Sequence, residues 1–267
     1  MALKPYDRDA LKQAFNSAEP FRHIAIEQFL EPDFAQEVAA AYPSFAEAEA
    51  QGFGFNFVNE RKKIQVSDST KFPEPVARLH NVLQSPKFLA DLEYITGMPT
   101  LVNDPALAGG GMHLTGPHGR LDVHVDFNYS EDTQAHRRLN ILVYLNPEWE
   151  EEWGGAVELW DRDVTKCHHS FLPKQNRMVL FETSQISFHG VTPLTCPPDK
   201  VRQSFAAYYY TREAPDNWDG SRHDTIFRAR PDEKMSKYFQ MPAERVQRGL
   251  QRGVRNAKKA IKGLIGR

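Results

Sequence analysis

The chain has 267 residues, of which 40% are hydrophobic and 25% charged, with 16 glycines, 18 prolines and only two cysteines. This composition excludes a collagen, a coiled coil, a disordered chain and a small module held together by disulfides or zinc. No apolar run is long enough for a transmembrane helix, and residues 1–20 lack the apolar core of a secretory signal. The formal net charge is -2, so we expect no nucleic-acid partner, and we predict a cytoplasmic protein with reduced thiols.

Residues 1–100 predict several helices and one short strand. Loose alternation of apolar residues indicates a strand within residues 21–29. A first helix is expected from Pro32 and a second over residues 76–83, because apolar residues recur there at steps of three or four. A third helix should follow Ser85, which has the character of an N-cap before a proline. We expect these 100 residues to form a helical lead-in packed on the core.

After Gly97 the pattern changes to short alternating runs separated by glycine, proline and asparagine. The clearest run is 138–145, with apolar residues at every second position. The expected strands cover residues 121–128, 138–145, 156–160, 178–182, 187–191 and 202–211. Many short strands favour a sandwich or barrel, and helices followed by strands favour an α+β fold. We therefore predict a β-sheet core over residues 101–212 and a polar connecting segment over 213–242.

The end of the chain differs in charge from the rest. Residues 243–267 hold eight arginines and lysines against one acid, so they carry +7, and the other residues carry -9. Apolar residues recur there at helical spacing, which predicts a basic amphipathic helix. Such a tail would lie on an anionic membrane surface, here the inner face, or pack on the acidic body. Its four glycines also leave disorder or another polyanion open.

A candidate metal site comes from His124, Asp126 and His189. His124 and Asp126 are two residues apart in an alternating stretch, so their side chains leave the same face of a strand. His189 lies in a second apolar strand and can supply a third ligand. Two histidines and one carboxylate can hold iron(II) and leave three positions open for a bidentate cosubstrate and oxygen.

A candidate anion site follows thirteen residues after His189. Arg202 and Ser204 share a strand face, and a guanidinium with a hydroxyl suits a carboxylate. Residues 205–210 are so apolar that an arginine facing inward would need a buried anion.

In this order the motifs resemble the signature of the 2-oxoglutarate- and iron(II)-dependent oxygenases, in the prolyl-4-hydroxylase-like branch. Residues 137–146, Trp149 and the glycine pair 154–155 resemble that branch's "YLN…W…GG…L" stretch. The resemblance covers about residues 100–212. It implies a double-stranded β-helix, also called a jelly roll, with iron held at its mouth by the two histidines and the aspartate named above.

The resemblance also implies the cosubstrate contacts and the reaction. Arg202 would pair with the C5 carboxylate of 2-oxoglutarate, aided by Tyr144 and Ser204, and His113 is a candidate for a further contact. The implied reaction hydroxylates an unactivated C–H bond with O2, while 2-oxoglutarate is decarboxylated to succinate and CO2. Ascorbate is considered as a stimulating reductant. Asp126 favours hydroxylation over halogenation, because halogenases of this superfamily replace that carboxylate with a small residue.

Two other functions stay open from the residues alone. The chain could be a cupin-like metal-dependent hydrolase or isomerase, or a non-catalytic jelly-roll binding protein. Arg202 with Tyr144 distinguishes the oxygenase from these two alternatives, because only the oxygenase needs a buried site for an anion. The substrate class also stays open between a small molecule, a glycan or lipid, and a peptidyl residue. Asn128, Arg138 and Asn140 are equally well explained as cleft residues or as a hydrogen-bonding layer of the barrel.

Overall fold

The structure is a computed structural model that describes residues 2–216 and 218–233. The predicted tail at 243–267 and the end of the connecting segment lie outside these residues. Within the described ranges, no helix combines the length and the apolar character that a membrane crossing requires.

The α-helices of the described ranges lie in the first hundred residues. They are α1 (Arg8–Ser17), α2 (Pro32–Ala40), α3 (Phe45–Gln51), α4 (Glu74–Leu83) and α5 (Pro86–Thr96). α2, α4 and α5 lie where the sequence pattern predicts them. The hydroxyl of Ser85 accepts from the Phe88 N–H at the start of α5, which ends at Gly97 with a φ of 71°. α1 and α3 were not predicted; Ser44 and Glu47 form a capping box that starts α3.

The strands of the described ranges form one curled, 13-stranded, antiparallel sheet. They are β1 (His23–Ile26), β2 (Phe53–Phe55), β3 (Glu60–Val66), β4 (Val102–Asn103), β5 (Gly111–Val125), β6 (Tyr129–Ser130), β7 (Ala135–Tyr144), β8 (Val157–Trp160), β9 (Cys167–Phe171), β10 (Met178–Glu182), β11 (His189–Val191), β12 (Arg202–Thr211) and β13 (Ile226–Phe227). The main path runs β1-β10-β7-β12-β5-β11-β8-β9. The predicted strands are therefore confirmed, although β5 begins ten residues earlier than expected.

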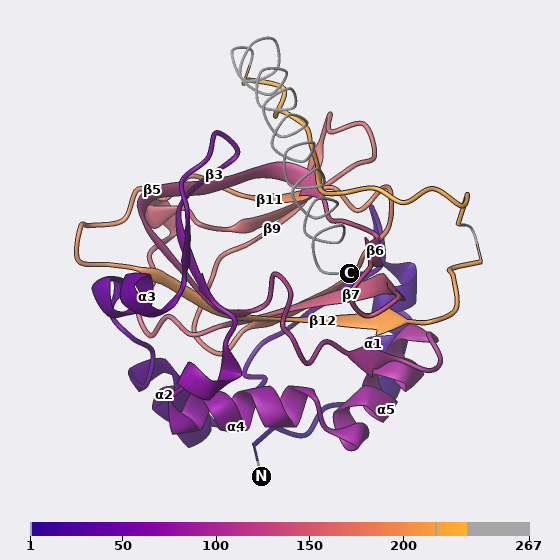
Figure 1. Ribbon diagram of the computed structural model, residues 1–267, viewed down its shortest axis with the longest axis horizontal. Coiled ribbons are helices and arrows are strands. Elements are labelled where there is room, and N and C mark those ends of the chain that lie inside the picture. The colour runs from indigo at the N-terminus through magenta and orange to yellow at the C-terminus, as the bar shows by residue number, and fades with distance from the viewer. Residues whose placement is uncertain (1, 217, 234–267) are drawn as a thin grey trace, which may run out of the picture.

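The long strand β5 belongs to both layers of the barrel. Its first half pairs with β12, in the register Arg202 to Thr115, and its second half pairs with β11, in the register His189 to His124. Between the halves, His118 has a φ of 62°, and Gly119 follows it. The strand can thus leave one layer and enter the other, so that the sheet curls into a jelly roll (Figure 1).

The two faces of β7 show how the barrel is packed. Leu139, Ile141, Val143 and Leu145 are buried in the main hydrophobic core, together with residues of α2, α4 and α5. These helices lie beneath β7 and β12 in Figure 1. On the opposite face Asn140 lines the barrel interior, whereas the Tyr144 ring packs among apolar residues and its hydroxyl accepts from Arg202. The predicted α+β jelly roll, buttressed by helices, is confirmed.

The first hundred residues also contribute strands to the barrel. β1 pairs with β10, and β3 pairs with β5 from Glu60 to Val66. β1 confirms the strand predicted within residues 21–29, but β2 and β3 were not predicted, because the stretch from Phe53 to Val66 mixes charged, aromatic and glycine residues without clear alternation. Ile64 and Val66 face the core, whereas Lys63 and Gln65 line the interior of the barrel.

Candidate active site

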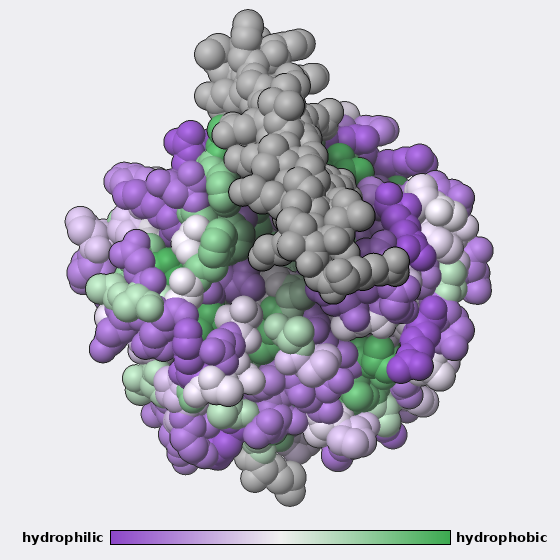
Figure 2. Space-filling model, in the orientation of Figure 1, coloured by the Kyte–Doolittle hydropathy of each residue, from purple (hydrophilic) through white to green (hydrophobic). Residues whose placement is uncertain are grey.

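A cavity of about 560 Å³ opens into the barrel interior. Its walls come mainly from β3, β5, β7, β11 and β12, with further residues from β2, β8, β10 and the segment around β13. Figure 2 shows a mostly hydrophilic face that is hollowed near its centre, with apolar residues beside the hollow. His124, Asp126, His189, Arg202 and Ser204 all line this one cavity. The structure thus brings both predicted groups of residues into a single site.

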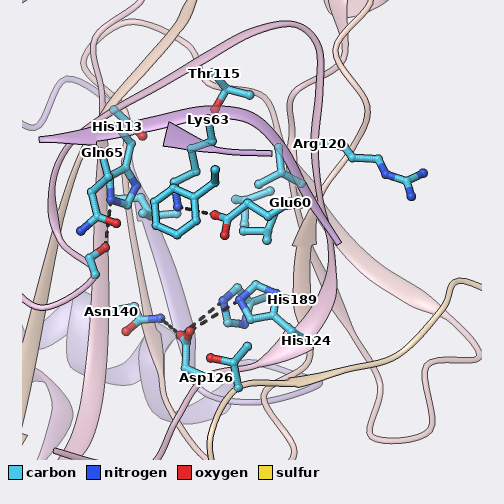
Figure 3. Close-up of a pocket in the computed structure, with 18 of the residues that line it drawn as sticks. Glu60, Lys63, Gln65, His113, Thr115, Arg120, His124, Asp126, Asn140 and His189 are labelled. Atoms are coloured by element: carbon cyan, nitrogen blue, oxygen red, sulfur yellow. Dashed lines mark hydrogen bonds and ion pairs between the residues drawn. The ribbon is translucent and has the colours of Figure 1, made fainter. Parts of the chain in front are cut away.

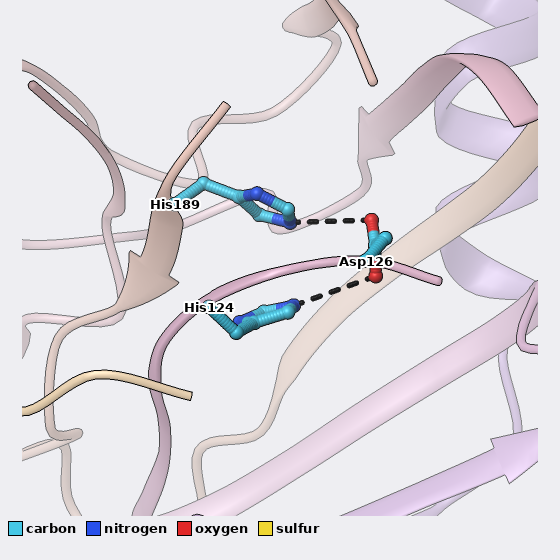
Figure 4. Close-up of side chains that lie close together, drawn as sticks. All are labelled: His124, Asp126 and His189. Atoms are coloured by element: carbon cyan, nitrogen blue, oxygen red, sulfur yellow. Dashed lines mark ion pairs between the residues drawn. The ribbon is translucent and has the colours of Figure 1, made fainter. Parts of the chain in front are cut away.

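His124, Asp126 and His189 line the cavity and converge on one another (Figure 4). His124 and His189 are partners on neighbouring antiparallel strands, and their ring centres lie 4.3 Å apart. The Nε2 atom of each histidine lies 3.5 Å from an oxygen of Asp126. One ligand atom from each of the three residues falls within 4.8 Å of the others, so one ion can contact all three.

The histidine rings are oriented by backbone carbonyls. His124 Nδ1 lies 2.9 Å from the Asp122 carbonyl, and His189 Nδ1 lies 2.9 Å from the Ser187 carbonyl. A carbonyl can only accept, so each Nδ1 carries the proton and each Nε2 presents a lone pair. Two neutral imidazoles and one carboxylate form the donor set that iron(II) accepts in a facial triad. The residues therefore fit such an ion.

Asp126 is held by two further side chains of β7. Asn140 donates to Asp126 Oδ2 at 2.7 Å, and Arg137 Nη2 lies 3.0 Å from the same oxygen. Arg137 also donates from Nε to Asn140 Oδ1 at 2.9 Å, and its guanidinium lies 3.6 Å from the centre of the Tyr208 ring. The carboxylate is thus fixed in position before any ion binds.

These contacts shift the acid–base behaviour of the triad. Burial alone would raise the pKa of Asp126, but the charge of the neighbouring Arg137 holds it well below its usual range. Burial, followed by the neighbouring His124, lowers the pKa of His189 to about 3. At neutral pH the site therefore presents an ionised carboxylate and a neutral His189, the forms that bind metal.

Arg202 is buried at another part of the same cavity. Its Nε donates to the Gly155 carbonyl at 2.7 Å, and its Nη2 donates to the Tyr144 hydroxyl at 3.3 Å. Gly155 has a φ of 72°, and a Cβ there would lie 3.1 Å from Arg202 Cδ, so the glycine makes room for the arginine. Among the described residues, no carboxylate lies within ion-pairing distance of Arg202.

Ser204 and His113 are neighbours beside this arginine. They are partners across β12 and β5, and both line the cavity. The Ser204 hydroxyl is buried and has no hydrogen-bond partner among the described residues. His113 Nε2 lies 2.9 Å from the Gly109 carbonyl, and burial, with Lys63 and Arg202 nearby, lowers its pKa well below the usual range. Both therefore reach the cavity as neutral polar groups, as Figure 3 shows for His113.

The other candidate cleft residues separate into two roles. Asn140 lines the cavity beside Asp126. Asn128 instead donates to the Ser221 carbonyl and accepts from the His223 N–H, and Arg138 donates to Thr211. Asn128 and Arg138 are absent from the described lining of the cavity, so they belong to the hydrogen-bonding layer of the barrel.

Sequence reasoning missed Arg137 as a site residue. Strict alternation along β7 places it with Leu139 and Ile141, on the face toward the helices. The pairing with β12 shifts between Tyr209 and Tyr210, so β7 contains one extra residue there. Such a bulge turns the side chains of the residues before it to the opposite face of the strand, so Arg137 reaches Asp126. No feature of the sequence marks this bulge.

The lead-in hairpin and the segment around β13 were also missed. Phe55, Lys63 and Gln65 enter the cavity from β2 and β3, and Lys63 pairs with Glu60 at 2.8 Å (Figure 3). Phe227 lies with its ring 5.3 Å from the His124 ring. These residues are far from the triad in sequence, so only strand pairing reveals them.

Comparisons with known proteins agree with this geometry. Residues 110–210 match the family model described as the 2OG-Fe(II) oxygenase superfamily. The prolyl 3-hydroxylase OGFOD1 of Mus musculus is 31% identical over 84 residues, which cover 30% of this chain and 15% of that protein. The prolyl 3,4-dihydroxylase OGFOD1 of Ostreococcus tauri is 26% identical over 226 residues, which cover 76% of this chain and 41% of that protein. The chain thus spans less than half the length of these relatives.

Solved structures show the same fold. A prolyl hydroxylase from Trichoplax adhaerens, solved with a peptide fragment of the hypoxia inducible factor oxygen degradation domain, has a TM-score of 0.56 at 16% identity. The match covers 76% of this chain and 90% of that one. The family match over residues 110–210 includes His124, Asp126, His189 and Arg202. Residues 110–210 thus match the 2-oxoglutarate- and iron(II)-dependent oxygenase superfamily, and the chain is similar to prolyl hydroxylases of that superfamily in sequence and in fold.

Proposed function

We propose that this chain is a 2-oxoglutarate- and iron(II)-dependent dioxygenase that hydroxylates a prolyl residue of a peptidyl substrate. In the overall reaction, the substrate C–H bond, O2 and 2-oxoglutarate give the C–OH product, succinate and CO2. The observation that carries the proposal is Arg202, a buried cation without a carboxylate partner among the described residues, in the same cavity as a facial triad.

Arg202 is poised for a dicarboxylate cosubstrate. A buried guanidinium without an anion is costly, and a carboxylate can accept its remaining N–H groups. Burial raises the pKa of the Tyr144 hydroxyl, so this group keeps its proton while it accepts from Arg202. It can therefore donate to the same carboxylate, and the free Ser204 hydroxyl lies within the same wall. One end of 2-oxoglutarate would lie here and the other at the triad.

The triad residues would hold iron(II) through His124 Nε2, His189 Nε2 and one oxygen of Asp126. Iron, when bound, supplies the oxygen activation that couples the decarboxylation of 2-oxoglutarate to hydroxylation. Arg137 and Asn140 keep Asp126 ionised and oriented. The buried walls exclude water from the reacting atoms, which limits side reactions.

The peptidyl, prolyl substrate is supported by the relatives. Those reported above are named as prolyl hydroxylases, and the Trichoplax adhaerens structure holds a peptide. In this chain the cavity is bordered by the hairpin of β2 and β3, where Phe53 and Phe57 are 61% and 47% exposed. Exposed aromatic rings beside the cavity can contact a proline-containing segment.

The test is a succinate assay with purified full-length chain, iron(II), 2-oxoglutarate and O2. Proline-containing peptides are screened against free L-proline and against peptides with alanine in place of proline. We expect succinate release with a proline-containing peptide, and one added oxygen on that peptide by mass spectrometry. His124→Ala is the matched negative control.

Two results would refute the proposal. The first is turnover of a substrate without 2-oxoglutarate, which is expected of a cupin-type hydrolase or isomerase. The second is the absence of succinate release with every substrate, together with the absence of any slow decarboxylation of 2-oxoglutarate without substrate, which is expected of a non-catalytic binding protein.

A further inference from the structure

A strap of residues 223–233, defined here as the C-terminal strap, runs antiparallel to the end of β5, the strand that carries His124 and that Asp126 directly follows. It lies outside the residues that match the family model. β13 in the strap pairs with β5, with Ile226 opposite Val125 and Phe227 opposite His124. The Arg228 N–H continues this ladder by donating to the Val123 carbonyl at 2.8 Å. The strap therefore gives β5, the strand of His124, a neighbour that the sequence analysis did not predict.

Arg230, near the end of the strap, is only 7% exposed and reaches three strands. Its Nε donates to Glu158 of β8 at 2.8 Å, and its Nη2 donates to the Val191 carbonyl of β11 at 3.2 Å. Its Nη1 lies 4.0 Å from Asp122 of β5 and 3.4 Å from Glu233. One guanidinium thus connects the strand of His124, the strand of His189 and their neighbour.

The contact with Val191 falls where the strand ladder is irregular. His189 pairs with His124, but Val191 pairs with Leu121, so the register of β11 and β5 shifts between them. A bulge disrupts backbone pairing, and backbone hydrogen bonds alone therefore do not fix the spacing of the two histidine strands. Arg230 supplies a donor to the Val191 carbonyl at this point.

A second observation supports this role. A Cβ at Gly190, the residue after His189, would lie 3.1 Å from Arg230 Nη2, so the glycine leaves room for the guanidinium beside β11, the strand of His189. On the β5 side, Asp122 provides the carbonyl that orients His124 Nδ1, and its carboxylate is buried beside Arg120 and Arg230. The charge network and the ring orientation of His124 thus share one residue.

We propose that Arg230 is a positioning residue for the metal centre, which sets the placement of His189 relative to His124. The proposal rests on the proposed metal site. Partners that orient metal ligands without touching the metal contribute about 10- to 100-fold to metal affinity. Loss of Arg230 should therefore weaken metal binding by about that factor, although Arg230 touches neither the metal ligands nor the cavity.

The experiment titrates cobalt(II) anaerobically into the metal-free, full-length chain and follows its visible ligand-field bands. The variants are Arg230→Gln and Arg230→Lys, with Arg222→Gln as the matched control. Arg222 is an exposed arginine just before the strap, ion-paired to Glu131 at 3.0 Å. Circular dichroism establishes that each variant is folded under the titration conditions, and urea unfolding of the metal-free forms measures stability separately.

We expect Arg230→Gln to bind cobalt(II) about 10- to 100-fold more weakly, with altered bands, and Arg222→Gln to match the parent. Arg230→Lys keeps the buried charge but cannot hydrogen-bond Glu158 and the Val191 carbonyl at the same time. The cobalt(II) affinity of this variant should therefore lie between that of the parent and that of Arg230→Gln. A purely structural role would change the urea midpoint and leave the affinity and bands of folded protein unchanged.

Parent-like affinity and bands in Arg230→Gln would overturn the proposal. If Arg230→Gln does not fold, Arg230→Lys decides in the same way. A parent chain that binds no cobalt(II) would refute the proposed metal site itself, so the two failures are distinguishable.

Discussion

Arg202 gives the sharpest test of the proposed cosubstrate site, because its replacement should weaken cosubstrate binding strongly and change the stability of the fold only slightly. Arg202→Met keeps most of the side-chain volume and removes the charge. The C5 carboxylate of 2-oxoglutarate then loses a buried, charge-assisted partner, which should cost about 2–5 kcal/mol of binding free energy. The dissociation constant should rise from about 30-fold to several thousand-fold, since each 1.4 kcal/mol is a factor of ten.

The stability of the ligand-free chain should change far less. Removing Arg202 deprives the Gly155 carbonyl of its partner at 2.7 Å, a net loss of about 1 kcal/mol, but it also removes a buried charge without a carboxylate partner among the described residues. Arg137→Met is the matched contrast, because it leaves the carboxylate of Asp126 without its buried ion pair at 3.0 Å. That variant should lose about 3–5 kcal/mol of unfolding free energy.

The assay is anaerobic titration of 2-oxoglutarate into the metal-loaded chain by calorimetry, with urea unfolding of the ligand-free variants. Arg202→Met should retain stability and lose the cosubstrate. Parent-like affinity for 2-oxoglutarate in Arg202→Met would refute the reasoning, and the anion would then bind elsewhere. A stability loss as large as that of Arg137→Met would show that Arg202 serves mainly the fold.

Four further outcomes are expected. Tyr144→Phe should weaken 2-oxoglutarate binding by only about 0.5–1.5 kcal/mol in the same titration, and a loss equal to that of Arg202→Met would contradict the assigned roles. Asp126→Ala should abolish both metal binding and succinate release, because a facial triad has no spare ligand; full decarboxylation would refute the site. Burial and Lys63 hold the pKa of His113 well below its value in the unfolded chain, about 6.5. The contribution of His113 to the free energy of unfolding should therefore be fully present above that pH and fall by up to about 1.4 kcal/mol per pH unit below it. His113→Gln should flatten this pH dependence of stability in urea unfolding. Replacing Lys258, Lys259 and Lys262 by glutamate in the full chain should reduce co-sedimentation with anionic vesicles at low salt, and unchanged binding would leave the tail without a membrane role.

The sequence by itself determined most of the chemistry. His124 and Asp126 share a face because side chains on a strand alternate with a period of two, whatever the rest of the fold does. The apolar surroundings of Arg202 likewise predicted an anionic ligand, since burying a guanidinium without an anion is costly. These inferences depend on local geometry and on the cost of burying charge, and both can be read from short stretches of the chain.

Only the tertiary structure decided which residues support the site. Arg137 reaches Asp126 because of a bulge in β7, and a single extra residue in a ladder leaves no mark on the sequence. Lys63 and Arg230 come from segments before and after the family-matched core, and pairing with β5 brings them to it. Strand pairing depends on the shape and register of the whole sheet. A residue's distance from the triad in space is therefore fixed by the fold, whereas its distance along the chain carries no such information.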